Sequence, residues 1–279
     1  MNQLVVQHAC SYLMSALRIT TDGPVQTICL NRPERRNAID PATAGALTDA
    51  VRAFDANDAL SVAVLTGEGQ HFCAGADLHA IAKGNVHTVD LDPDADGPLG
   101  PTRMRLSKPI IAAVEGYAVA GGLELACWCD LRIVSETAVF GVFCRRVGVP
   151  LVDGGTQRLP QIVGLGRALD LILTGRPVEA QEAHDIGLAT RVVPAGTARA
   201  EAEALAHQLA SFPQMCLRSD RAAVYAGLGV PLREGLVLEA EQGRRVLDSG
   251  ETADGASRFA KGAGRHGAPM DATDDSSAS

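Results

Sequence analysis

A carboxylate that follows a pair of glycines, in Gly121-Gly122-Leu123-Glu124, is the part of this chain best suited to chemistry. If Gly121 opens a helix, its N–H has no acceptor inside that helix and lies at the positive end of the helix dipole, where it can bind an oxyanion. Glu124 follows about one turn later between Leu123 and Leu125, so burial would raise its pKa and suit it to general acid–base work near neutral pH. The alternative is a Gly-Gly turn before a helix whose Glu124 is solvated.

A second segment offers another backbone donor. The apolar run Val62–Gly67 predicts a short buried strand that ends in turn residues, and the segment from Phe72 to Leu78 follows it. Gly75 relaxes the backbone there, and Asp77 is predicted to cap a helix, which would leave the N–H of Ala74 free. Two such donors from separate loops, converging on one oxygen, would stabilise a thioester enolate.

Several motifs in a fixed order carry a resemblance to a known family. The chain resembles the crotonase (enoyl-CoA hydratase/isomerase) superfamily from about Leu17 to about Phe259. The matching pieces are Leu30 to Ala38, Phe72 to Leu78, Lys108 to Tyr117, Gly121 to Ala126, Cys129-Asp130, Gly154 to Pro160, and Leu173 to Arg176. Together they are far more specific than any one of them.

The resemblance implies an α/β fold, a crotonase-like spiral of repeated ββα units with a C-terminal helical segment. It also implies an acyl-CoA substrate, an oxyanion hole formed by Ala74 and Gly121, and Glu124 as the first catalytic glutamate. Coenzyme A is then part of the substrate, and no metal or redox cofactor is needed. A homotrimer or a dimer of trimers is implied as well. The substrate-binding positions implied are Arg36, Ala38, Ala74, Gly75, Ala76, Asp77 and Gly122.

The chain departs from the family pattern at the second catalytic position. Hydratases of this family carry a second glutamate after a Phe-Gly pair, and that position falls here on Cys144. A thiol, with a reference pKa of about 8.5 against about 4.3 for glutamate, cannot simply replace a carboxylate. Arg145 and Arg146 could lower the thiol pKa if they point inward. Asp153 is the other candidate for the second acid–base group, and the alternative is that it caps the helix beginning near Thr156.

Composition is that of a large globular protein with an acidic balance. The chain has 279 residues, 46% hydrophobic and 21% charged, and a formal net charge of −8. Because it has no concentrated basic stretch, nucleic acid is not an expected partner. Local positive charge for a CoA ligand is expected from three arginines near the start of the chain, Arg32, Arg35 and Arg36.

Cysteine usage predicts a cytoplasmic protein. Seven cysteines, an odd number, lie scattered through apolar segments, which suits reduced thiols rather than a disulfide framework. Neither the cysteines nor the histidines form a metal-binding pattern. The N-terminus lacks the pattern of a signal peptide, and no apolar stretch is long enough to span a bilayer.

The pattern along the chain predicts four segments: a flexible extension (1–16), the ββα core (17–196), a helical segment (197–265) and a disordered tail (266–279). Within the core, Asp40-Pro41 begins a helix with a buried face. The acidic stretch from Lys83 to Pro101 is predicted as a mobile surface loop, which in the family borders the acyl pocket. Gly262 to Gly267 matches G-x-G-x-x-G but lacks a preceding strand, so no dinucleotide site is expected. Packing positions predicted in the helical segment are Leu205, Leu209, Leu236, Leu238 and Val246.

The function expected from these observations is that of an enoyl-CoA hydratase/isomerase, a hydro-lyase first of all. Other outcomes stay open because Cys144 stands where a second glutamate is usual. They are an enoyl- or dienoyl-CoA isomerase without hydratase activity, an acyl-CoA hydrolase or decarboxylase, and a non-catalytic acyl-CoA-binding homologue. Retention of Glu124 beside Gly121 argues against the last, since binding alone needs no desolvated carboxylate.

Overall fold

The core of the protein is a sheet with its strands in the order β1-β2-β3-β4-β6-β9, seen in a computed structural model that describes residues 15–263. β1 runs antiparallel to β2, and all other neighbours in this sheet are parallel. The six strands are β1 (Leu17–Asp22), β2 (Val25–Leu30), β3 (Val62–Gly67), β4 (Ile110–Val114), β6 (Leu131–Ser135) and β9 (Arg191–Val193). Parallel strands place all their carboxyl ends, and the loops that follow them, at one edge.

A smaller sheet lies beside the main one. It contains β5 (Tyr117–Val119), β7 (Val139–Gly141) and β8 (Val178–Glu179), in that order. Its strands β5 and β7 lead into the segments that begin at Gly121 and Phe143. The order strand, strand, helix recurs as β1-β2-α1, β4-β5-α3 and β6-β7-α4, with short 3-10 turns at η1 (Pro33–Arg35), η2 (Pro101–Arg103) and η3 (Phe143–Val147). These repeats confirm the ββα units that the sequence predicted.

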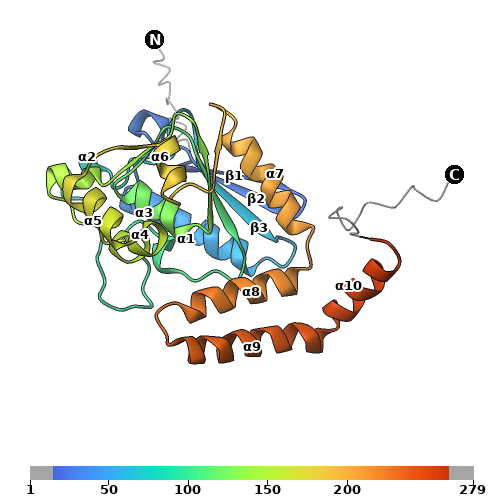
Figure 1. Cartoon of the computed structure of the whole chain (residues 1–279). Helices are drawn as coiled ribbons and strands as arrows, with labels where there is room; N and C mark the ends of the chain where they lie inside the picture. The colour runs from blue at the N-terminus through green and yellow to red at the C-terminus, as the bar shows by residue number, and fades with distance from the viewer. Residues whose placement is uncertain (1–14, 264–279) are drawn as a thin grey trace, which may run out of the picture.

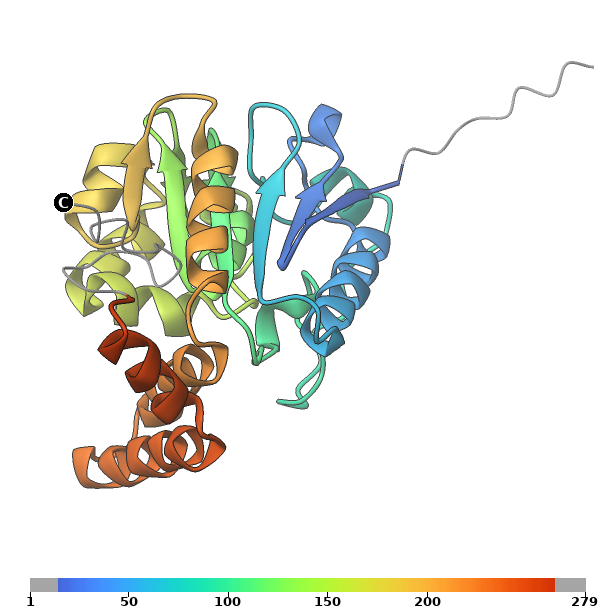
Figure 2. The same ribbon diagram turned by 90° about the vertical axis from the view of Figure 1, so that its right-hand side faces the viewer.

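Helices cover both faces of the main sheet. α7 packs on one face against the valines and isoleucines of β2, β3, β4 and β6, and it stands in front of the sheet in Figure 2. The other face meets α1, α3 and the small sheet in the larger core cluster. The helices are α1 (Pro41–Ala56), α2 (Leu78–Ala82), α3 (Gly121–Trp128), α4 (Gly155–Val163), α5 (Leu165–Thr174), α6 (Ala180–Asp185), α7 (Ala198–Ala210), α8 (Gln214–Gly227), α9 (Leu232–Ser249) and α10 (Glu251–Ala260).

Local sequence rules account for α1. Asp40 lies in the extended conformation before it and accepts a hydrogen bond from the N–H of Thr43, while Pro41 occupies the first turn. The predicted apolar face is confirmed, since Leu47, Ala50, Val51 and Phe54 are all buried.

The C-terminal helices project from the body of the protein (Figure 1). Leu205 on α7 and Val246 on α9 are buried as predicted, and Leu209 and Leu238 are half-buried. The prediction for Leu236 is wrong: it is 53% exposed, because α9 packs against α8 rather than against the sheet and so buries only a narrow face. Three predictions lie outside the described residues in whole or in large part. They are the N-terminal extension (1–16), of which only residues 15 and 16 are described, the tail (266–279), and most of the G-x-G-x-x-G match.

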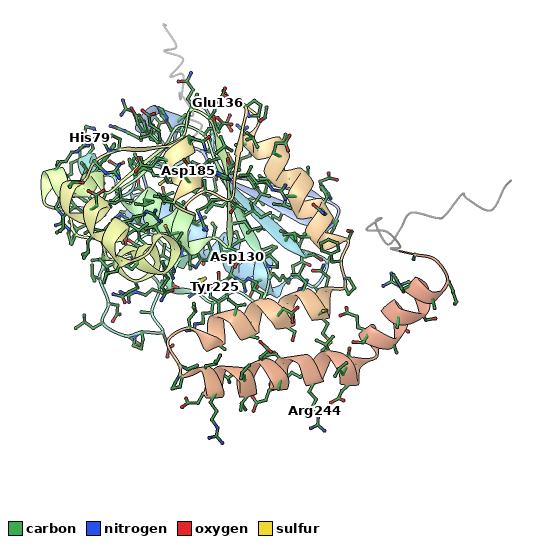
Figure 3. The ribbon with its side chains drawn as sticks, in the orientation of Figure 1. His79, Asp130, Glu136, Asp185, Tyr225 and Arg244 are labelled. Carbon is green, nitrogen blue, oxygen red and sulfur yellow. The ribbon has the colours of Figure 1, made fainter. Side chains whose placement is uncertain are left out.

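A polar joint built on Asp130 ties α8 to the core. One oxygen, Oδ1, accepts hydrogen bonds from Arg221 Nε at 2.8 Å and from the Tyr225 hydroxyl at 2.7 Å. The other oxygen, Oδ2, accepts the N–H of Ile110 at the start of β4 at 2.8 Å. Figure 3 shows Asp130 and Tyr225 close together where α8 meets the core. One carboxylate thus joins the sheet to the helical segment.

Replacing Tyr225 by phenylalanine should lower the free energy of unfolding by about 1.5–3 kcal/mol, because a hydrogen bond to a charged acceptor is lost. Urea denaturation followed by circular dichroism measures this. Tyr117→Phe is the matched control, since no described residue pairs with the Tyr117 hydroxyl. An equal loss in both variants would show that the Asp130 joint contributes nothing special.

Candidate active site

A cavity of about 320 Å³ opens among the loops that precede α2, α3 and α4. Most of its wall is apolar. Its polar or titratable members are Glu124, Cys144, Asp153, His87 and Arg146. The apolar members include Ala74, Ala76, Leu78, Ile81, Val86, Val89, Pro98, Leu99, Phe143, Val147, Val149, Pro150 and Val152. The structure therefore brings Ala74, Gly121, Glu124, Cys144 and Asp153, all predicted site residues, to one cavity.

Glu124 lies on α3 and is only 2% exposed. Its Oε1 accepts the N–H of Asp153 at 2.9 Å and the N–H of Gly155 at 2.8 Å, at the beginning of α4. A side chain at position 155 would not fit, because a Cβ there would lie 2.8 Å from Glu124 Cγ. Both hydrogen bonds end on Oε1, which leaves Oε2 as the oxygen for exchange with a ligand.

Burial dominates the electrostatics of Glu124 and raises its pKa to about 7. The hydrogen bond from Gly155 opposes this by stabilising the carboxylate, and the negative charge of Asp153 adds to the rise. The alternative of a solvated Glu124 is therefore wrong. A carboxyl group with this pKa can give and take a proton at neutral pH.

Asp153 is the second buried carboxylate at the cavity, at 2% exposure. Its Oδ1 accepts the N–H of Leu99 at 2.9 Å and the hydroxyl of Thr102 at 2.5 Å. The cap alternative is wrong, because Gly154 occupies the cap position of α4 and no side chain bonds to the first turn. Burial raises the pKa of Asp153, and the bonds from Thr102 and Leu99 act against that rise.

Cys144 lies in η3 and is buried at the cavity wall. Burial, and next the charge of Glu124, raise the pKa of its thiol, so the thiol is neutral at physiological pH. The charge of Arg145 lowers the thiol pKa, but by less than burial and Glu124 raise it, and both neighbouring arginines have other partners. Arg145 Nε donates to the carbonyl of Ile172, and Arg146 Nη2 donates to that of Gly175.

A strained residue sets the direction of the Gly121 N–H. Ala120 has φ 55° and ψ −125°, which a side chain rarely tolerates and which costs about 1–3 kcal/mol. Its own N–H donates to the carbonyl of Gly141 at 2.8 Å, and its carbonyl accepts Leu123 N–H at 3.1 Å, so both neighbours hold it in place. As the first residue of α3, Gly121 has an N–H without a helical acceptor, and no other described residue accepts from it.

The structure corrects the second predicted donor. The N–H of Ala74 is not free, because it donates to the carbonyl of Arg36 at 3.0 Å. The chain turns at Gly75, with φ 87°, and then pairs with Ile39. The N–H of Ile39 donates to the carbonyl of Gly75, and the carbonyl of Ile39 accepts the N–H of Asp77. The N–H of Ala76 therefore points away from Ile39, and no described residue accepts it.

Close packing brings the two free N–H groups together. A Cβ added to Gly75 would lie 2.7 Å from the nitrogen of Gly121, so the loop carrying Ala76 touches the start of α3. Gly122 plays a packing role too, since a Cβ there would collide with the carbonyl of Cys73. Ala76 and Gly121 both line the cavity.

The other predicted binding residues have local structural contacts. Arg36 is exposed and its guanidinium lies 5.7 Å from the Tyr117 ring centre. The carbonyl of Ala38 accepts a hydrogen bond from Arg32. Asp77 caps α2 as predicted and also pairs with Arg32 at 2.8 Å, so Arg32 serves the fold rather than a free anion.

One contributor to the site, His87, was missed in the sequence. The stretch after Lys83 is irregular as predicted, and it forms one cavity wall, as the resemblance implied, through Val86, His87, Val89, Pro98 and Leu99. His87 anchors this wall by a 2.9 Å hydrogen bond between its Nε2 and the carbonyl of Ile39. In the sequence, a histidine close to valines within an otherwise acidic stretch could have indicated that this part of the loop packs inward.

Within residues 15–263, no group of histidine, cysteine or acidic residues is arranged to hold a metal ion. No helix in the same range combines the length and apolar character needed to cross a membrane.

Known structures define the fold class. The chain is similar to the crystal structure of an enoyl-CoA hydratase from Mycobacterium marinum, with a TM-score of 0.82 and 32% identity over 88% of this chain and 96% of that one. The fold is the crotonase fold. The family model for enoyl-CoA hydratase/isomerase matches residues 20–263. The chain belongs to the enoyl-CoA hydratase/isomerase family.

Relatives of known sequence cover nearly the whole chain. A probable enoyl-CoA hydratase of Rhizobium meliloti is 39% identical over 84% of this chain and 88% of its own length. A carnitinyl-CoA dehydratase of Proteus mirabilis is 35% identical over 89% of this chain and 97% of its own. Both names are those of enzymes acting on CoA thioesters.

Glu124 should make the protein less stable as the pH rises from about 4.5 to about 7. In that window the unfolded chain loses the glutamate proton while the folded chain still holds it, so the unfolding free energy falls by up to about 3 kcal/mol and then levels off. Urea titrations of wild type and Glu124→Gln across this range measure the difference. Parallel pH profiles of the two proteins would contradict the raised pKa.

Proposed function

We propose that this chain acts on an enoyl-CoA thioester, forming an enolate and moving a proton with Glu124. The observation that carries the proposal is a buried carboxyl group with a pKa of about 7 that faces the same cavity as two unpaired N–H groups. Family membership supports the same reaction class.

The N–H groups of Ala76 and Gly121 form the proposed oxyanion hole. With the thioester oxygen between them, negative charge that develops on deprotonation or addition is held by fixed donors in a dry site. The loss of such a donor typically costs about 2.7–4 kcal/mol of transition-state stabilisation. Glu124 Oε2 then exchanges a proton with the acyl carbons, because Oε1 is held by α4.

Double-bond isomerisation without hydration is the second candidate, and Cys144 favours it. Adding water needs a group that activates the water, and a neutral thiol in an apolar wall is a poor base. Moving a double bond needs a proton removed from one carbon and returned to another, which one carboxylate can do. Asp153 is the proposed second acid–base group for hydration.

Substrate binding follows from the shape and charge of the same region. The apolar wall suits an apolar acyl group, and the exposed side chains of Arg35 and Arg36 supply positive charge for the phosphates of CoA. The reduced cysteines support a cytoplasmic location. The family resemblance also supports a homotrimer or dimer of trimers that works without a metal or redox cofactor. Light scattering and metal analysis of the purified protein test these last points.

A bound CoA thioester should place its carbonyl oxygen within about 2.7–3.2 Å of both Ala76 N and Gly121 N. A crystal structure with a slowly reacting acyl-CoA measures the two distances. An oxygen bonded to neither nitrogen would remove the oxyanion hole from the proposal.

Glu124→Gln should reduce turnover by about 10²–10⁴-fold while KM changes little, because the amide keeps the shape but cannot exchange a proton. Glu136→Gln, the same change on an exposed residue remote from the cavity lining, should turn over like wild type. Steady-state kinetics with a 2-enoyl-CoA and a 3-enoyl-CoA supply the comparison. Full activity in Glu124→Gln would assign the proton transfer to another group.

The products decide between the two candidates. Hydration adds the mass of water to the acyl-CoA, isomerisation moves the double bond at constant mass, and hydrolysis releases free CoA. Asp153→Asn should abolish hydration, whereas Asp94→Asn on the exposed part of the stretch from Lys83 to Pro101 should not. Robust hydration that survives Asp153→Asn would exclude Asp153 as the second acid–base group.

A further inference from the structure

The thiol of Cys144 differs in its surroundings from the other described cysteines. Cys29 and Cys129 donate to backbone carbonyls, and Cys73 accepts the N–H of Gly75. Cys144 is 6% exposed, and its sulfur is approached by its own backbone N–H and by that of Arg145. Of the cysteines in this range, it is the one that lines the cavity. A buried thiol is therefore held at the wall of the proposed acyl site.

The groups around this thiol suit it to react with a ligand rather than with the protein. Phe143 and Val147 on η3, and Val149 after it, make the wall beside it apolar. The side chains of Arg145 and Arg146 bond to carbonyls at the end of α5 and just after it, and Arg146 also lines the cavity. Glu124, at the same cavity, is the charged group that acts most strongly on it.

We propose that Cys144 is a nucleophile for α,β-unsaturated acyl thioesters and captures them as a reversible covalent adduct. This inference rests on the proposed function, which seats an enoyl thioester in the cavity. A bond forms from Sγ to the β-carbon, and the carbon–carbon double bond becomes an enolate whose oxygen lies at the N–H groups of Ala76 and Gly121. The S–H proton passes to Glu124 and then to the α-carbon, so the step is neither an oxidation nor a reduction.

The same groups reverse the addition. Glu124 removes the α-proton, the enolate re-forms, and the sulfur leaves with the proton returned to it. Because the thiol is neutral while the site is empty, it needs a base for the addition, and Glu124 is the buried base at hand. Capture would thus be confined to thioesters that fill the cavity with the double bond next to the carbonyl.

Mass spectrometry of the intact protein tests the inference. Wild type mixed with crotonyl-CoA and quenched in acid should gain the full mass of crotonyl-CoA, and peptide mapping should place the gain on Cys144. Butyryl-CoA, the saturated analogue, should give no gain. Cys144→Ser should stay unmodified, whereas Cys216→Ser, which removes the exposed thiol, should be modified like wild type.

A wild-type protein without an adduct on Cys144 overturns the inference, and so does an adduct that persists in Cys144→Ser. Peptide mapping of wild type gives the site even if the serine variant fails to fold. The acyl-CoA recovered from the same quenched samples reports turnover separately. Turnover without an adduct leaves the proposed function intact, and an adduct without any turnover supports capture but contradicts that function.

Discussion

The contact between Glu124 and the start of α4 is the interaction on which the rest of the site depends. A buried carboxylate must be held, and here two backbone N–H groups, those of Asp153 and Gly155, hold one of its oxygens. The same contact fixes the loop before α4, which places Asp153. Asp153 in turn binds Leu99 and Thr102 and so fixes one wall of the cavity. A glycine at position 155 is required for this close approach.

Opposing effects on Glu124 set its pKa near neutral pH. Desolvation alone would keep the group protonated, and hydrogen bonds at a helix start alone would keep it ionised. Burial exceeds the hydrogen bonds by a margin that leaves the pKa of Glu124 at about 7. The cavity therefore holds a group that changes its charge near physiological pH, with no histidine at hydrogen-bonding distance from it among the described residues.

Local rules predicted much of this structure because the features in question are local. The cap at Asp40, the buried face of α1 and the strand Val62–Gly67 each depend on a few neighbouring residues. The burial of Glu124 was visible in the leucines on either side. The free N–H was assigned to Ala74 instead of Ala76, because the direction of an amide near Gly75 depends on pairing with Ile39, a contact remote in sequence. The partners of Asp153 also come from a distant segment, so its role could not be separated from capping.

Several backbone amides end on the two buried carboxylates, and this makes them natural spectroscopic reporters. The amides of Asp153 and Gly155 bond to Glu124, and the amide of Leu99 bonds to Asp153. The nuclear resonance of an amide proton moves when the carboxylate that accepts it changes charge. Neighbouring acids that titrate as a coupled pair are hard to separate by kinetics. In this protein the ionisation of each acid can be followed through the amide proton that bonds to it, so no reporter group or substitution has to be placed in the cavity.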